Sequence, residues 1–134
     1  MKIMYVLDTD TCVEILRGND RVINRRRSVY APVVTTEITA SELFYGAAKS
    51  NDPAHNRQVV LEFLRTLEVL PISLTGAQFF GGFKAKLQAN GTLIADADLW
   101  IASISRAVNA KIVTGNTRHL GSIPGVECED WIRG

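Results

Sequence analysis

Three apolar segments of this chain each stop at a carboxylate where an amphipathic helix begins. The carboxylates are Asp8, Glu42 and the pair Asp96 and Asp98. A carboxylate beside a buried apolar run is costly unless it is hydrogen-bonded, paired with a cation or bound to a metal. Acids from three distant segments can meet only through the fold. Where they meet, the chain would need a cation.

Short runs of β-forming residues alternate with helical patterns along the whole sequence. The expected strands cover residues 2–7, 32–36, 69–72, 111–114 and, at the edge, 126–128. The expected helices cover residues 11–16, 20–27, 39–47, 53–67, 75–89 and 96–108. Strands separated by helices favour parallel pairing with right-handed crossovers. We therefore expect a single domain over residues 1–134, an α/β fold forming a three-layer α/β/α sandwich with a mainly parallel sheet of four to five strands.

The bulk composition bounds the class of protein without naming a partner. A hydrophobic content of 46% with 22% charged residues is ordinary for a globular chain, and the net charge of +1 leaves no excess of base for nucleic acid. No apolar run reaches the roughly 20 residues of a bilayer span, so we expect a cytoplasmic protein without membrane contact. Cys12 and Cys128 are too few and too isolated for a zinc site and are expected as reduced thiols.

The acids are expected at one edge of the sheet. In open parallel sheets, ligands bind outside the carboxyl ends of the strands, where Asp8, Asp98 and Thr114 fall. Asp8 ends the most hydrophobic strand, and the following residues offer other caps for the helix, so a functional carboxylate is favoured there. For the pair before the sixth helix, we assign the helix cap to Asp96 and a metal-ligand role to Asp98.

Several acids and hydroxyls also have an explanation in helix capping. The segments Thr11–Glu14 and Thr39–Glu42 both match the capping box, and Thr75 with Gln78 forms a third match. For Glu14 the cap is the favoured interpretation. For Glu42 the cap and a functional role stay equally open.

An oxygen-only set of acids selects a hard divalent cation such as Mg²⁺, with Mn²⁺ as a substitute. Such an ion activates water for attack on phosphorus and offsets charge on the phosphoryl oxygens. Phosphodiester or phosphoryl chemistry is therefore the leading class. The sequence has no spaced histidine pair, phosphate-binding glycine loop or serine-hydrolase motif. Asp10 and Asn116 are auxiliary candidates, although both are common turn residues.

Five motifs in order closely resemble the PIN-domain toxins of the VapC family. They are Leu7–Cys12, Ser41–Gly46, Asp98–Ala102, Val113–Arg118 and Ile123–Trp131. The resemblance implies a magnesium-dependent ribonuclease of a toxin–antitoxin pair, usually a homodimer silenced by a VapB-like antitoxin. The RNA substrates of such toxins are often transfer RNA.

The resemblance also assigns roles to residues. The metal-binding aspartates of the family match Asp8 and Asp98, its conserved glutamate matches Glu42, and Thr114 matches a hydroxyl beside the metal. The fourth, more variable acidic position falls at Asn116, which leaves one ligand fewer for a second ion. With Asp8 and Asp98 on the ion, Glu42 is expected to orient or deprotonate the attacking water.

This chain departs from many relatives at two further places. Ile104 stands where they have a histidine, and Arg118-His119-Leu120 stands where they often read Arg-Glu-Phe. The change at Ile104 is expected to alter packing rather than metal binding.

Basic side chains near these motifs could neutralise RNA phosphates. The candidates are Lys84, Lys86, Arg106 and Arg118. For each lysine, a solvated helix face is an equally good explanation.

Three other interpretations are open. Asp8 and Asp10 also resemble the nucleophile and acid of haloacid dehalogenase-like phosphatases, although no lysine is suitably placed and Glu42 would have no role. A receiver domain would need an aspartate after the third strand, where this chain has Leu70–Ser73. A non-catalytic PIN-like binding module is the third.

Overall fold

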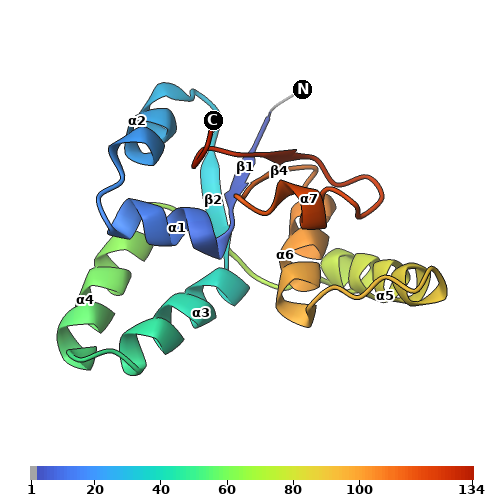
Figure 1. Cartoon of the computed structure of the whole chain (residues 1–134), viewed down its shortest axis with the longest axis horizontal. Coiled ribbons are helices and arrows are strands. Elements are labelled where there is room, and N and C mark those ends of the chain that lie inside the picture. Colours follow the sequence, from blue (N-terminus) through green and yellow to red (C-terminus); the bar gives the residue numbers. More distant parts are fainter. Residues whose placement is uncertain (1–2) are drawn as a thin grey trace.

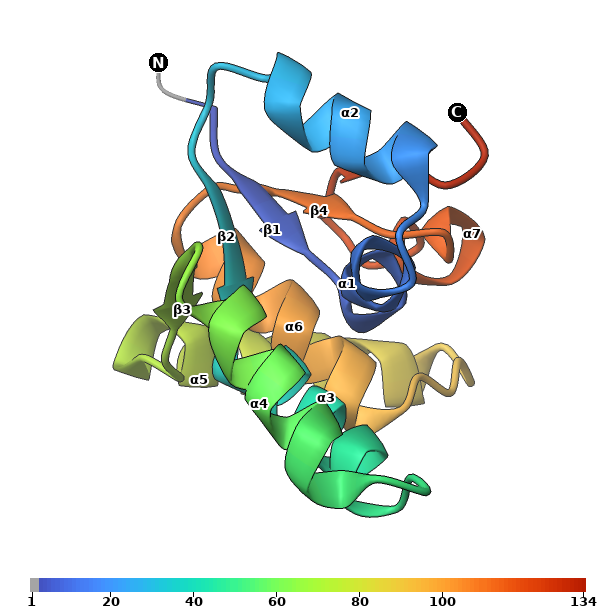
Figure 2. The same cartoon turned by 90° about the vertical axis from the view of Figure 1, so that its left-hand side faces the viewer.

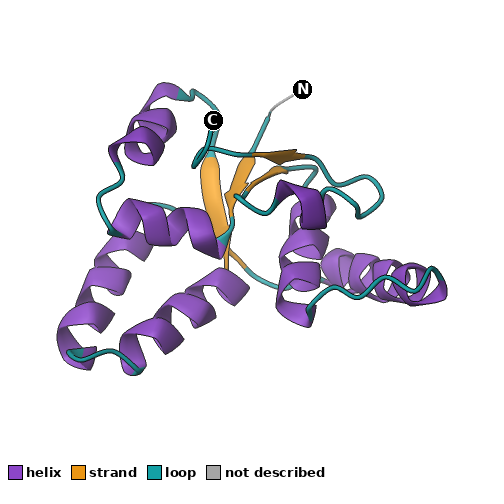
Figure 3. Ribbon diagram, in the orientation of Figure 1, coloured by secondary structure: helices purple, strands orange, loops and turns teal. Residues whose placement is uncertain are grey.

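A computed structural model describes residues 3–134; Lys2, which we expected in the first strand, lies outside the described residues. Helices and strands alternate along the chain (Figure 3). The strands are β1 (Tyr5–Leu7), β2 (Val33–Thr36), β3 (Glu68–Leu70), β4 (Lys111–Val113) and β5 (Cys128–Glu129). The helices are α1 (Thr9–Leu16), α2 (Asp20–Ser28), α3 (Glu37–Ala48), α4 (Pro53–Leu64), α5 (Leu74–Ala89), α6 (Asp96–Ala107) and α7 (Thr117–Leu120).

The five strands form one parallel sheet in the order β3-β2-β1-β4-β5. In its centre, Val6 of β1 pairs with Val34 of β2 on one side and with Ile112 of β4 on the other. The α/β fold with a mainly parallel sheet of four to five strands is therefore confirmed. That residues 1–134 make up a single domain stays a prediction.

Helices cover both faces of the sheet, and the strands alternate between two apolar cores. Leu7 and Val113 pack on the side of α1 to α4, whereas Val6 and Ile112 pack on the side of α5 to α7. Figure 1 shows these two groups of helices on either side of the strands, and Figure 2 shows the molecule from the side of α1 to α4. The period of two residues is what a strand buried on both faces requires.

The order of the strands locates a binding crevice. From β1 the chain moves outward to β2 and β3, and it returns to the other side of β1 with β4. This reversal is a topological switch point, and the crevice lies beyond the carboxyl ends of β1 and β4. Asp8 follows β1 and Thr114 follows β4, so both residues stand at the crevice.

Three of the expected helix starts are wrong. Helix α1 begins at Thr9 with Asp8 as its cap, so Thr11 and Glu14 form no capping box. Glu14 instead accepts hydrogen bonds from the side chains of Asn19 and Arg17. Helix α5 is capped by Ser73, whose Oγ accepts from Gly76 N at 2.9 Å, rather than by Thr75.

The third error concerns α3, which begins at Glu37 under a cap by Thr36. Thr39 is therefore inside the helix, and the Thr39–Glu42 capping box does not form. The short helix α7 was not expected from the sequence at all. At the starts of α1, α3 and α5 the sequence offers several hydroxyl or acidic residues close together. Which of them caps the helix depends on how the helix packs against the sheet.

Two other expectations have a structural answer. Cys12 and Cys128 are both free thiols, as predicted. Among the helices of residues 3–134, none is both long enough and apolar enough to cross a membrane.

Candidate active site

Asp8 stands at the centre of the crevice with both carboxylate oxygens held. Its side chain is 6% exposed. Oδ1 accepts from the backbone N of Thr9 at 2.8 Å, and Oδ2 accepts from the hydroxyl of Thr114, also at 2.8 Å. The backbone N of Asp8 donates to Val113 O, which fixes the residue to β4. Asp8 is thus both the cap of α1 and the buried acid between the two central strands.

The surroundings of Asp8 disfavour its charged form. Burial raises the pKa of Asp8 to about 6, although the hydrogen bonds from Thr114 and Thr9 oppose the rise. The negative charges of Asp10 and Asp98 contribute to the same rise. Asp10 and Asp98 are therefore close enough to Asp8 to repel its charge.

Glu42 reaches the same region from α3. It is exposed, and its Oε1 accepts a hydrogen bond from the Thr9 hydroxyl at 2.6 Å. Thr9 Oγ1 also lies 3.1 Å from Oγ1 of Thr39, which is fully buried. Of the two roles left open for Glu42, the helix cap is excluded.

Asp98 is in the first turn of α6 and is half-buried. Burial raises its pKa, and the nearby charges of Glu42 and Asp10 raise it too, while His119 lowers it. Asp98 therefore lies among the other acids. The expectation for Asp96 is wrong: the cap position of α6 is Ala95, without a side-chain bond, and Asp96 forms an ion pair with Lys84 at 3.1 Å.

The loop after β4 is held by Asp10 and by the C-terminal segment. Asp10 Oδ2 accepts from Gly115 N at 2.8 Å, and Arg133 Nη1 donates to Gly115 O at 2.7 Å. The backbone N of Asn116 donates to Thr114 Oγ1 at 2.9 Å, and the Asn116 side chain makes no capping bond for α7. Asp10 and Asn116 therefore act here on the position of Thr114.

The acids of the site form no ion pairs within the described part of the chain. The ion pairs among residues 3–134 involve none of Asp8, Asp10, Glu42 and Asp98. In the same part of the chain, no three acid, histidine or cysteine groups are close enough to form a complete ligand set. Mg²⁺ binds proteins through one or two carboxylates and keeps several waters, so an uncompensated, oxygen-only and loosely spaced set suits this ion better than Zn²⁺.

The four basic candidates differ in how far they are engaged. Lys84 is paired with Asp96, and Arg106 donates to Asn109 and lies over the ring of Phe79. Lys86 and Arg118 are exposed, and neither forms an ion pair with another of the described residues.

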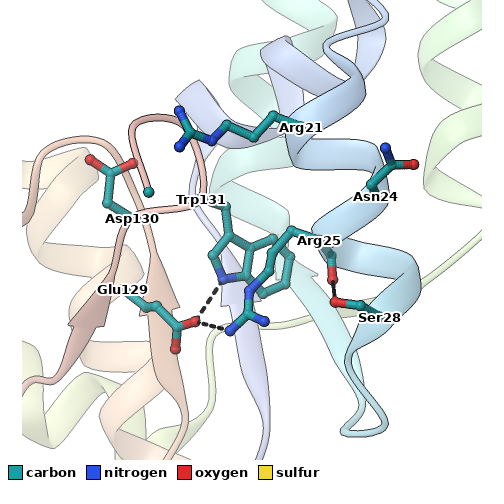
Figure 4. Close-up of a pocket in the computed structure, with 8 residues that line it drawn as sticks. Arg21, Asn24, Arg25, Ser28, Glu129, Asp130 and Trp131 are labelled. Atoms are coloured by element: carbon teal, nitrogen blue, oxygen red, sulfur yellow. Dashed lines mark hydrogen bonds and ion pairs between the residues drawn. The ribbon is translucent and has the colours of Figure 1, made fainter.

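The largest of the hollows described below does not coincide with the acidic site. A hollow of about 600 Å³ lies between α2 and the C-terminal segment, where Arg25 and Trp131 both donate to Glu129 (Figure 4). Glu129 is thereby engaged by two donors, and Ser28 donates to the backbone oxygen of Arg25. A second hollow of about 420 Å³ borders Thr9 and Glu42 and is otherwise lined mainly by apolar side chains of α1, α3 and α4.

Two residues of the site were not predicted from the sequence. Thr9 contacts Glu42 across 33 residues of chain, and His119 acts on Asp98 from the unexpected helix α7. The position of Thr9 directly after Asp8 was the only available signal for it.

The chain is similar to known proteins over nearly its whole length. The family model described as PIN domain matches residues 5–123. The tRNA(fMet)-specific endonuclease VapC of Salmonella typhimurium is 34% identical over 95% of this chain and 97% of its own length. Ribonuclease VapC2 of Haemophilus influenzae is 30% identical over 96% of this chain and 98% of its own length. The crystal structure of VapBC2 from Rickettsia felis, bound to a DNA fragment from the promoter, contains a chain that matches with a TM-score of 0.91 at 30% identity, covering 96% of this chain and 99% of that one.

Proposed function

Because the chain belongs to the PIN-domain VapC family of ribonuclease toxins, we propose that Asp8, Asp98 and Glu42 form its metal-dependent catalytic site. As a VapC protein it is an endoribonuclease and the toxin of a toxin–antitoxin pair. The observation that best supports the catalytic site is that Asp98 lies near enough to Asp8 and to Glu42 for their charges to interact, while no ion pair within residues 3–134 involves any of the three acids.

In this proposal Asp8 and Asp98 hold Mg²⁺, or Mn²⁺ in its place, directly or through water. A bound ion would supply a water of lowered pKa and neutralise charge on the phosphoryl oxygens. Thr114 fixes Oδ2 of Asp8 by its hydrogen bond. Glu42 has Oε1 engaged by Thr9, so Oε2 is the atom that orients the attacking water and accepts its proton.

The substrate and partners are part of the same proposal. The Salmonella relative is named for cleavage of tRNA(fMet), which supports transfer RNA as the substrate class and the cytoplasm as the place of action. The Rickettsia structure is of a toxin with its antitoxin, which supports a VapB-like antitoxin as partner. A homodimer is expected from the family resemblance. Arg118 and Lys86 are the exposed candidates for contact with RNA phosphates.

The family membership and the structure weigh differently on the alternatives. A phosphatase of the haloacid dehalogenase type is excluded by membership in the PIN family. A receiver domain is excluded as well, since β3 ends at Leu70 and is followed by proline. The remaining alternative, that this chain is a non-catalytic member of the family, is tested by the experiment below.

The test is cleavage of purified transfer RNAs, including tRNA(fMet), by purified protein with Mg²⁺ or with EDTA. We expect cleavage only with the metal, and a loss of at least about 100-fold in rate for Asp8→Asn and for Asp98→Asn. Asp20→Asn is the matched control, because Asp20 is an exposed aspartate on α2. Equal cleavage by the parent and Asp8→Asn would refute the assignment. A folded parent that cleaves no RNA with Mg²⁺ or with Mn²⁺ would identify a binding module.

A further inference from the structure

The Thr9 hydroxyl is the only described group that holds Glu42. Its Oγ1 lies 2.6 Å from Oε1 of Glu42 and 3.1 Å from Oγ1 of Thr39. Glu42 forms no ion pair and no other side-chain hydrogen bond within residues 3–134. The three side chains form a short line from the buried interior of α3, across the first turn of α1, to the exposed carboxylate.

The chemistry of the three groups sets the direction of these hydrogen bonds. A hydroxyl has one proton to donate, and an ionised carboxylate can only accept. Thr9 therefore donates to Glu42, and the second contact must be a donation from Thr39 to Thr9. At 2.6 Å, the bond to Glu42 has the length of a charge-assisted O–H···O⁻ bond. Thr39 has no other side-chain partner among the described residues, so its buried hydroxyl is satisfied through Thr9.

An exposed glutamate has several rotatable bonds, and a proton acceptor works only when it is held in one orientation. We propose that Thr9 is a positioning residue, which fixes Oε1 of Glu42 so that Oε2 is presented to the attacking water, and that Thr39 orients the Thr9 hydroxyl in turn. This inference rests on the proposed role of Glu42. It concerns kcat, because the hydrogen bond orients a reacting group and does not contact RNA.

The backbone of Thr9 makes a second hydrogen bond, which a substitution of the side chain leaves intact. Its N–H donates to Oδ1 of Asp8 at 2.8 Å. Thr9→Val keeps the β-branched shape and this backbone bond but removes the hydroxyl, whereas Thr9→Ser keeps the hydroxyl. The two substitutions therefore separate the bond to Glu42 from the packing of the residue.

The experiment measures kcat and KM for tRNA cleavage with saturating Mg²⁺, and the thermal unfolding of each variant. For Thr9→Val we expect kcat to fall by about 10-fold, as for the loss of one hydrogen bond to a charged group, with KM unchanged. Thr9→Ser should recover activity to within about threefold of the parent. Thr75→Val is the matched control, since Thr75 is exposed on α5, on the other face of the sheet.

A double-mutant cycle separates this inference from the proposed function. In a Glu42→Ala background, Thr9→Val should have no further effect on kcat, because the reacting group that its hydroxyl holds is gone. If Thr9→Val lowers kcat equally in both backgrounds, or leaves kcat of the parent unchanged while Glu42→Ala lowers it, the positioning role is refuted and the role of Glu42 stands. If Glu42→Ala itself retains full activity, the proposed role of Glu42 fails and the inference fails with it. Should Thr9→Val unfold, Thr9→Ala in the same cycle gives the same decision.

Discussion

Asp8→Asn should stabilise the metal-free protein even though it removes a residue of the proposed active site. Asp8 is buried, and its pKa is about 6 in the folded chain compared with 3.8 for a free aspartate. At about 1.4 kcal/mol per pKa unit, the folded state loses about 3 kcal/mol when Asp8 is fully ionised. Asparagine resembles the neutral acid but forms weaker hydrogen bonds with Thr9 and Thr114. These weaker bonds reduce the stability gained by the variant by about 1 kcal/mol.

The net expectation at pH 8 is a gain of about 2 kcal/mol in the free energy of unfolding, or roughly 5 °C in Tm. The sign follows from the raised pKa. Above pH 6 the parent carries the cost of the buried charge, and as pH falls from 6 towards 4 Asp8 takes up a proton in the folded state first, so the parent gains stability. The advantage of the variant should therefore shrink over this interval, and below pH 4 the variant should be less stable than the parent by about 1 kcal/mol, because only the weaker hydrogen bonds remain.

The assay is urea unfolding in EDTA at pH 4, 5, 6, 7 and 8, with Asp20→Asn as control. Asp20 is exposed on α2, so its substitution should change stability by less than about 0.5 kcal/mol at every pH. A difference between Asp8→Asn and the parent that stays constant with pH would refute the reasoning, and so would a less stable variant at pH 8. Added Mg²⁺ should stabilise only proteins that retain Asp8.

Three further predictions concern the loop after β4, the hydrogen bond from Thr114 to Asp8, and the basic residues proposed to contact RNA. Gly115→Ala should cost about 1 kcal/mol in a urea melt, because the added Cβ would lie 2.9 Å from Asp10 Oδ2 and displace the carboxylate that accepts from Gly115 N, whereas Gly82→Ala, with open space around its Cβ in α5, should be neutral or stabilising. Thr114→Val removes a hydrogen bond that lowers the pKa of Asp8, so the acid limb of the pH–rate profile should move to higher pH, and an unmoved limb would contradict this role. Arg118→Ala should weaken binding of RNA to catalytically inactive protein and reduce the salt slope by about 1, while Lys84→Ala should do less because Asp96 already neutralises that ammonium; equal losses would argue against the distinction.

The layers of the fold were predictable because the signals are local. Each strand of the centre is a short apolar run, and each is followed by a helical pattern, so the parallel sheet follows from alternation alone. The acids at the strand ends also follow from this alternation. The residues that cap the helices were not predictable, because Asp8, Thr9, Asp10 and Thr11 all suit a cap in type.

What selects Asp8 as the cap is a contact from the far end of the chain. Its backbone N–H donates to Val113 O of β4, and its carboxylate accepts from Thr114. These two bonds fix Asp8 at the end of β1, so the helix begins at the next residue. The bond between Thr9 and Glu42 is equally invisible in the sequence, because it depends on how α1 lies against α3. Such contacts are set by tertiary packing, which overrides local propensity.

The order of the strands also bears on when this toxin acquires its activity during synthesis. Asp8 leaves the ribosome well before its hydrogen-bond partner Thr114, which follows 106 residues later. Pairings so distant in sequence form late, after the intervening loops have closed. We therefore expect the nascent chain to remain without nuclease activity until the segment around Thr114 has been made and has folded onto β1, which gives an antitoxin time to meet the chain before any RNA is cut.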